Sequence, residues 1–145
     1  MDDYKIYENG PVIGFIHNIS KNQLKYLKMR ISDFDIGKEV RYLMMIYDNP
    51  NLSQDDLVNF YGESKANIAK SLKKLEDDGY IIREVNPDNR RKYMIKTTSK
   101  ANELVAKVRQ ISSDWEKEVG IDESDEEFKN KIREIAVKGM KLTEG

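Results

Sequence analysis

The sequence predicts a mainly helical α+β protein in which one short β-hairpin is placed among helices. Three observations favour this fold class. Apolar residues recur at helical spacing along most of the chain, two short helical segments are separated by only three residues, and two β-rich runs enclose one concentrated turn signal. At 145 residues, the chain has the usual size of one compact unit with a single core.

Two helices are expected in the first third of the chain. Pro11 opens the first helix, whose apolar stripe weakens around Ser20, and the second helix covers roughly residues 37–47. The second helix ends before a turn signal at residues 48–50. The stripe of the first helix consists of Ile13, Ile16, Leu24, Leu27 and Ile31.

A helix-turn-helix is expected next. Ser53 fits as the N-cap of a short helix that runs to about Tyr61, and Gly62 breaks this helix. Ser64 caps the following helix, which Gly79 ends. Of these two helices, the one that begins after Ser64 is the candidate for insertion into a DNA major groove. Its inner face is formed by Ile68, Leu72 and Leu75.

A β-hairpin with basic residues follows directly. Residues 80–85 form a β-rich run, the sequence NPDN at residues 86–89 is a turn signal, and residues 93–97 return as the partner strand. Residues 61–100 hold ten Lys and Arg against six Asp and Glu, a local charge of +4, although the whole chain carries −1. A helix beside a basic hairpin suits double-stranded DNA, because the helix can enter the major groove while the hairpin follows the backbone.

The C-terminal third is expected to be helical and to need a partner. Its two apolar stripes are too extensive to face water, so with the first helix they would form a bundle that a second copy completes in two-fold symmetry. We therefore expect residues 1–32 and 99–145 to be dimerisation helices around a winged helix-turn-helix DNA-binding lobe of residues 33–98. The stripes are Leu104, Val108, Ile111, Trp115 and Val119, then Phe128, Ile132, Ile135 and Met140.

The sequence gives little support to an enzyme, a metal site or a membrane protein. It has no cysteine, no phosphate loop and no nucleophile beside a base, His17 is its single histidine, and residues 122–127 lack the ligand spacing of a calcium loop. The N-terminus lacks the plan of a signal peptide, and no apolar run has membrane-spanning length. We expect a cytoplasmic protein that is not an enzyme and uses no cofactor, with His17 at an interface or partly buried.

The segment LEDDGYIIREVNPDNRRKYMIKTT resembles the most recognisable stretch of the MarR family of winged-helix transcription regulators. The residues that fit the family pattern are Leu75, Glu76, Gly79, Ile81, Arg83, Pro87 and Thr98. In that family an aspartate of the wing orients an arginine. Counting back from Thr98 places Asn89 and Arg91 at these two positions, with Asp88 and Arg90 as the alternative pair. A second departure is Ala101 in place of the glycine that follows the closing threonine in the family.

The expected DNA contacts lie on the second helix of the helix-turn-helix and on the wing. Asn67 can bond an adenine edge with both its amide atoms, whereas the lysines suit phosphates. A solvated helix face is the plainer interpretation, but the neighbouring turn and basic hairpin favour DNA contact. An arginine at the wing tip suits a narrow minor groove. The candidates are Ser64, Lys65, Asn67, Lys70 and Lys74 on the helix, and Arg90, Arg91 and Lys92 on the wing.

The resemblance also implies a cavity between the bundle and the DNA-binding lobe, in which relatives hold phenolic or aromatic carboxylate effectors. Tyr26, Tyr42 and Tyr47 either line such a cavity or belong to an ordinary core. Trp115 lies on an apolar stripe, so we expect it to pack in the core or in the dimer interface.

These observations predict a regulator that binds double-stranded DNA in a sequence-specific way. It would repress transcription by occupying a palindromic operator as a homodimer, and a small aromatic or phenolic effector would release it. The alternative is a winged-helix adaptor that binds protein or RNA, which the charge of −5 on the remainder of the chain favours. Salt-sensitive affinity for particular duplexes distinguishes the first hypothesis from the second.

Overall fold

The computed structural model describes residues 8–144 and confirms the mainly helical α+β class. The first seven residues of the expected segment 1–32 lie outside the described part of the chain. The elements in chain order are α1 (Val12–Arg30), η2 (Ser32–Phe34), α2 (Val40–Asp48), α3 (Gln54–Tyr61), α4 (Lys65–Asp77), β1 (Ile81–Asn86), β2 (Asn89–Thr97), α5 (Ala101–Val119) and α6 (Glu126–Thr143).

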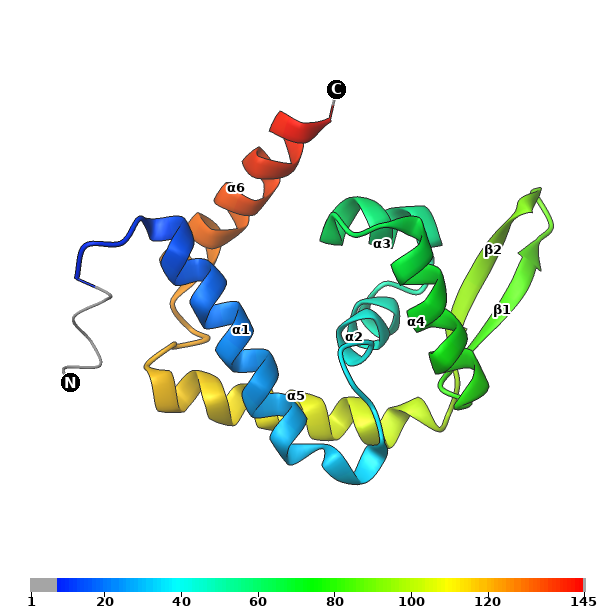
Figure 1. Cartoon of the computed structure of the whole chain (residues 1–145), viewed down its shortest axis with the longest axis horizontal. Coiled ribbons are helices and arrows are strands. Elements are labelled where there is room, and N and C mark those ends of the chain that lie inside the picture. The colour runs from blue at the N-terminus through cyan, green and yellow to red at the C-terminus, as the bar shows by residue number, and fades with distance from the viewer. Residues whose placement is uncertain (1–7, 145) are drawn as a thin grey trace.

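The molecule is elongated, with the terminal helices at one end and the wing at the other (Figure 1). Helix α5 runs lengthwise beneath both halves, and α1 crosses it (Figure 1). Helices α2, α3 and α4 lie at the end from which the hairpin of β1 and β2 protrudes, with α2 between α4 and α5 (Figure 1). Helix α6 extends away from the other end of α5 (Figure 1).

Helix α2 begins three residues later than expected. Residues 37–39 form a tight turn in which Val40 N donates to the carbonyl of Gly37 at 3.1 Å, and Asp35 adopts a left-handed conformation with φ 47°. The carboxylate of Glu39 is bonded to the backbone N–H of Gly37 at 3.0 Å. These side-chain and turn contacts stabilise a loop where spacing alone predicted helix.

The wing is a two-stranded antiparallel sheet whose second strand is longer than expected. Strand β2 begins at Asn89 rather than at Tyr93, because Asn86 pairs directly with Asn89 across a two-residue turn. The register then pairs Val85 with Tyr93 and Arg83 with Ile95. Cross-strand pairing thus overrides the low strand propensity of the charged residues that follow Asn89. The basic residues of the wing therefore lie on a strand and not in a loop.

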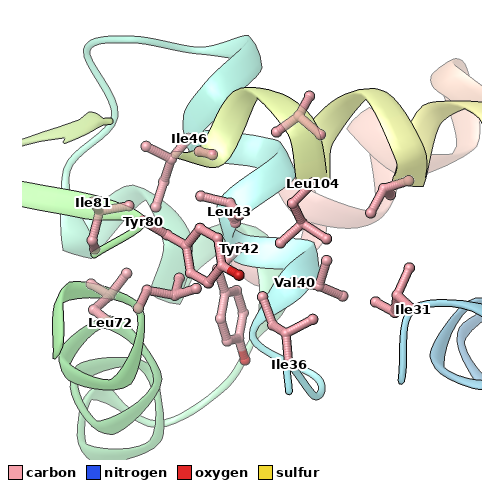
Figure 2. Packing of buried hydrophobic residues seen from close by; sticks show 14 of the residues in the cluster. Ile31, Ile36, Val40, Tyr42, Leu43, Ile46, Leu72, Tyr80, Ile81 and Leu104 are labelled. Carbon is pink, nitrogen blue, oxygen red and sulfur yellow. The ribbon is translucent and has the colours of Figure 1, made fainter. Parts of the chain in front are cut away.

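One apolar cluster holds the molecule together, and it lies where α2 packs between α4 and α5 (Figure 2). It continues from α1 through α2–α4 and the wing into the first half of α5, so it crosses both expected boundaries of the central lobe. Its buried members are Leu27, Ile31, Ile36, Val40, Tyr42, Leu43, Ile46, Leu57, Ile68, Leu72, Leu75, Tyr80, Ile81, Ile95, Ala101, Leu104, Val105, Val108 and Ile111.

The apolar residues at the other end of the molecule are not covered by this chain. None of the described residues of α6 is buried, and Phe128, Ile132 and Ile135 are each more than two fifths exposed. At the start of α1, Val12 and Ile13 are exposed to a greater extent still. The stripes expected in the terminal helices are therefore present, and five of their fourteen residues are exposed: Ile13, Val119, Phe128, Ile132 and Ile135.

Candidate nucleic-acid interface

Helix α3 begins and ends where its capping residues were expected. The hydroxyl of Ser53 accepts from the N–H of Asp56 at 3.1 Å, and the Asp56 carboxylate accepts from the N–H of Ser53 at 2.8 Å. This reciprocal pair is a capping box. At the other end Gly62 has φ 64°, a conformation that costs glycine little and other residues more. The turn that follows is therefore set by local chemistry.

Helix α4 starts directly after that turn with an uncompensated N-terminus. The hydroxyl of Ser64 accepts from the N–H of Asn67 at 3.2 Å, which confirms Ser64 as the N-cap. The first turn of α4 carries no acidic residue, whereas that of α3 carries Asp55 and Asp56. The positive end of the α4 dipole thus remains available to an anion such as a phosphate.

The outer face of α4 presents most of the expected contacts to solvent. Lys65, Asn67 and Lys70 are exposed, while the inner face is fully buried. The Nζ of Lys65 lies 3.6 Å from a carboxylate oxygen of Asp55. A pair this exposed contributes little to stability, so a phosphate can replace Asp55 at small cost.

Lys74 has a different role from the one expected. Its Nζ lies 2.8 Å from the Asp78 carboxylate, 3.1 Å from that of Glu39 and 3.1 Å from the carbonyl oxygen of Asp35. These three acceptors use all three N–H donors of the ammonium group, and the hydrogen bond to Asp78 is the main cause that raises the pKa of Lys74. Lys74 therefore fastens the end of α4 to the loop before α2. Helical spacing could not show this, because the loop is distant in sequence.

The basic residues of the wing are exposed to solvent, and the backbone of one of them is held by a hydrogen bond. Arg90, Arg91 and Lys92 are all exposed. The side-chain oxygen of Asn89 accepts from the backbone N–H of Arg91 at 3.2 Å, and that of Asn86 accepts from the N–H of Asp88 at 2.9 Å. The first of these bonds links Asn89 with Arg91, the pair given by counting back from Thr98.

A concavity of about 260 Å³ lies between the wing and the beginnings of α3 and α4. Four cationic residues and one acidic residue line it, so it favours anions. Its lining was only partly expected: Arg83 and Tyr93 join it because alternate residues of a strand share one face. The lining residues are Ser53, Gln54, Asp55, Lys65, Arg83, Arg91, Lys92, Tyr93 and Ile95.

Arg83 is positioned in this concavity by an ion pair with α4. Its Nε and Nη2 each lie 3.1 Å from an oxygen of the Glu76 carboxylate, a geometry in which both groups are fixed. The hydrogen bond from Arg83 holds the pKa of Glu76 below its ordinary value. The pair joins β1 to α4, so the wing and the helix present their cations at a fixed spacing.

The structure does not bring the three candidate effector tyrosines together. Tyr42 is fully buried, and burial together with its hydrogen bond to Glu63 raises its pKa to about 12. The guanidinium carbon of Arg30 lies 3.6 Å from the ring centre of Tyr26, and Arg109 covers the ring of Tyr47 at 5.2 Å. Tyr42 belongs to the apolar cluster and Tyr26 and Tyr47 pack against it, which is the second of the two alternatives, an ordinary core.

A different set of residues surrounds a concavity of about 420 Å³ between α1, α2 and α5. Its walls are largely apolar, with Arg41 and Tyr61 as the main polar groups. No sequence pattern pointed to Arg41, which is the one basic residue of α2. The lining residues are Ser20, Gln23, Leu24, Leu27, Arg41, Met44, Met45, Tyr61, Val108 and Ser112.

The remaining candidates have ordinary surroundings. His17 is exposed, and Trp115 is half-buried on α5. Within residues 8–144, three or more potential metal ligands do not gather at any point. Likewise, none of the helices described here has both the length and the apolar character to cross a membrane.

Comparison with known proteins agrees with this geometry. The MarR family model matches residues 38–93. The chain is 26% identical over 136 residues to the HTH-type transcriptional regulator BilQ of Clostridioides difficile. The alignment covers 93% of this chain and 92% of BilQ. The crystal structure of MarR superposes with a TM-score of 0.80 at 25% identity, covering 93% of this chain and 95% of MarR.

A more distant structure adds to the likeness in fold. The MarR family regulator of Listeria monocytogenes complexed with 26mer DNA superposes with a TM-score of 0.74 at 19% identity, covering 92% of this chain and 89% of that regulator. The fold and the basic face thus define a winged helix-turn-helix protein. Residues 38–93 match the MarR family model, and the chain is similar to MarR-type transcriptional regulators over more than nine tenths of its length.

Proposed function

We propose that this protein binds double-stranded DNA in a sequence-specific way and represses transcription by occupying an operator. The observation that carries the proposal is the shared basic surface of α4 and the wing, which surrounds the cationic concavity of about 260 Å³. Phosphates would bind at this surface, since backbone contacts supply most of the affinity of DNA-binding proteins.

Each exposed candidate then has a stated role. Asn67 reads a base edge in the major groove, while Lys65 and Lys70 bind phosphates beside the N-terminus of α4 at Ser64. On the wing, Arg91 or Arg90 enters the minor groove, and Lys92 binds the backbone. Lys74 is left out of this surface because its donors are used within the protein.

We further propose that residues 1–32 and 99–145 form the dimerisation bundle around the lobe of residues 33–98. The exposed stripe of α6 and the exposed start of α1 support this assembly, since apolar faces of this extent are normally covered by a partner. A two-fold dimer would bind imperfect palindromes whose half-sites lie about 10 bp apart, one helical turn of DNA.

A small aromatic effector would bind in the concavity between α1, α2 and α5, and its binding would release the operator. Its apolar walls and its single arginine suit such a ligand better than the dispersed tyrosines do. Such a ligand shifts the protein only if it binds the released conformation more tightly than the DNA-bound one.

One selection tests the proposed function against the adaptor alternative. Duplexes that bind the purified protein are recovered from a random pool, and the affinity of the best duplex is measured at several salt concentrations. We expect palindromic sequences and an affinity that falls linearly on logarithmic axes as salt rises. Recovery of no preferred duplex, together with binding of RNA or protein, would contradict the proposal.

A further inference from the structure

Glu63 lies in the turn of the helix-turn-helix and is held by two side chains of α2. The Nη2 of Arg41 donates to one oxygen of the Glu63 carboxylate, and the hydroxyl of Tyr42 donates to the other oxygen. The same Nη2 also donates to the Tyr42 hydroxyl at 3.1 Å, so the three side chains form a closed ring of hydrogen bonds. A carboxylate that is bonded through both oxygens is fixed in orientation as well as in position.

Tyr61, the last residue of α3, joins this ring to the helix before the turn. Its hydroxyl donates to the backbone carbonyl of Arg41 at 3.1 Å, and its ring packs edge-on against that of Tyr42, with the ring centres 5.0 Å apart. We call Arg41, Tyr42, Tyr61 and Glu63 the Arg41 network. It connects α2 to the residues on both sides of the turn.

The Arg41 network is largely shielded from water. Tyr42 is fully buried, and the side chains of Arg41 and Glu63 are only 34% and 22% exposed. Hydrogen bonds and ion pairs are stronger where water is excluded, and removing one partner of such a pair costs much more than it does at the surface. Burial and the bond to Glu63 raise the pKa of Tyr42 to about 12, so its hydroxyl remains a donor at neutral pH.

The start of α4 is placed in the molecule mainly through Glu63. Ile68 is the first buried residue of α4, so residues 64–67 have no side chain in the core. The bond from the N–H of Asn67 to the hydroxyl of Ser64 shapes the first turn of the helix but does not fix its place. A Cβ added to Gly62 would meet no atom within 4 Å, so the turn itself borders open space. Glu63 directly precedes residues 64–67 and ties them to α2.

We propose that Glu63 is a positioning residue that makes DNA binding sequence-specific, because the Arg41 network holds residues 64–67 where Asn67 reaches a base edge. A base contact depends on the direction of both amide atoms of Asn67, whereas a lysine follows a phosphate over a range of positions. Loss of the network therefore lowers affinity for the preferred duplex and leaves affinity for random duplexes in place. This inference rests on the proposed function, in which Asn67 is the reader.

The first experiment compares Glu63→Gln with the wild-type protein on the selected duplex and on a random duplex. The substitution keeps the size of the side chain and removes the charge that pairs with Arg41. We expect the ratio of the two affinities to fall by about 5- to 150-fold, the value of one bidentate base contact. Asp48→Asn is the matched control, since it neutralises a carboxylate of α2 that pairs with Arg109 at the surface. Its affinity ratio should be unchanged.

The second experiment separates position from stability. Val105→Ala truncates a buried residue of α5 outside the Arg41 network, so it should lower the urea midpoint of unfolding and keep the affinity ratio. Tyr42→Phe removes one hydroxyl and should lower the ratio less than Glu63→Gln does. The double variant should lose less than the product of the two single losses, because both act through one carboxylate. If Glu63→Gln does not fold, Tyr42→Phe takes its place in both experiments.

The third experiment tests the positioning without DNA, by amide hydrogen exchange. The N–H of Asn67 donates to the Ser64 hydroxyl at 3.2 Å, and that of Ile68 donates to the Ser64 carbonyl at 3.1 Å. In Glu63→Gln both amides should exchange about tenfold faster or more, as expected when a hydrogen bond to a charged group no longer holds the turn. Asp48→Asn should leave both rates unchanged.

Every outcome bears on the inference. An unchanged affinity ratio in Glu63→Gln overturns it, and so does an equal fall in Asp48→Asn or Val105→Ala. Equal losses on the selected and random duplexes also overturn it, since the network would then support binding as a whole. If the wild-type protein prefers no duplex, the proposed function fails, and the positioning is judged by hydrogen exchange alone. Unchanged exchange of Asn67 and Ile68 in Glu63→Gln would then overturn the inference.

Discussion

Helices α4 and α6 have the same amphipathic pattern and opposite surroundings. In α4, Ile68, Leu72 and Leu75 are fully buried within the chain. In α6, Phe128 and Ile132 are each 45% exposed, and no described residue of the helix is buried. The pattern of a helix therefore shows that one face needs covering, but it does not show what covers it. For α4 the cover is the chain's own core, and for α6 we propose a second copy.

The largest expected effect is the loss of that second copy. Replacing Ile132 and Ile135 by Asp places two charges in the proposed interface, so we expect a monomer where the wild-type protein is a dimer at micromolar concentration. A dissociation constant near 1 μM corresponds to about 8 kcal/mol of association free energy. Sedimentation velocity measures the change, with Lys131→Asp and Lys138→Asp as the control pair that alters charge beside the stripe. A wild-type protein that sediments as a monomer would contradict the interface.

Cavity formation in α4 should come next in size. Leu72→Ala should lower the free energy of unfolding by about 2–5 kcal/mol, the usual cost of truncating a buried leucine. The loss should be the same at every protein concentration, because Leu72 is buried within one chain. Ile132→Ala should instead cause a loss that depends on protein concentration. Urea unfolding at two concentrations compares them, and a concentration-dependent loss for Leu72→Ala would remove the contrast between the two helices.

The outer face of α4 should show a smaller effect that depends on DNA sequence. Asn67→Ala should cost about 1–3 kcal/mol on the best duplex and relax preference at one base position. Unfolding free energy should change little, since the side chain of Asn67 is exposed. Binding to the selected duplex and to random DNA gives the comparison. An equal loss on both would mean that Asn67 holds the backbone and reads no base.

Two lysines four residues apart on α4 should behave differently. Lys70→Ala should flatten the dependence of log affinity on log salt by about one unit, as expected for one lost phosphate contact. Lys74→Ala should leave that slope unchanged and lower the free energy of unfolding by about 1 kcal/mol, because buried Glu39 loses its cation. Salt titrations and urea unfolding of both variants test this. A reduced slope for Lys74→Ala would restore it to the DNA surface.

What the sequence predicted well depends on local chemistry. The start of α3 at Ser53 and of α4 at Ser64, and the break at Gly62, follow from hydrogen bonds and dihedral preferences within a few residues. The MarR resemblance likewise rests on a continuous stretch of the chain. Such signals are visible because the residues that interact are neighbours in sequence.

What the sequence missed depends on contacts between distant segments. The role of Lys74 follows from the loop at Glu39, and that of Arg41 follows from Glu63, over twenty residues away. The tyrosines were grouped by type, but Tyr26 and Tyr47 lie on different helices, under Arg30 and Arg109. Residue type and helical period cannot give such pairings, because the fold must first bring the elements together.

The smallest expected effect concerns the wing, where the exposed end of the molecule can be compared with its core. Asn89 accepts from the backbone N–H of Arg91, but as a neutral amide it cannot form an ion pair with the guanidinium. Asn89→Asp should therefore stabilise the ordered wing by about 0–1 kcal/mol, the usual contribution of an exposed ion pair. The added negative charge also opposes phosphate, so the change in DNA affinity should be small.

Alanine variants of Arg90 and Arg91 decide which of the two guanidinium groups the carboxylate introduced by Asn89→Asp would pair with. Arg91→Ala should reduce binding most on duplexes with A·T pairs beside the half-sites, because those tracts narrow the minor groove and deepen its negative potential. Arg90→Ala should reduce it less, since the backbone N–H that donates to Asn89 belongs to Arg91. A larger loss for Arg90→Ala would assign the pair to Asp88 and Arg90. If neither variant weakens binding, the wing does not contact DNA, and the basic surface is confined to α4.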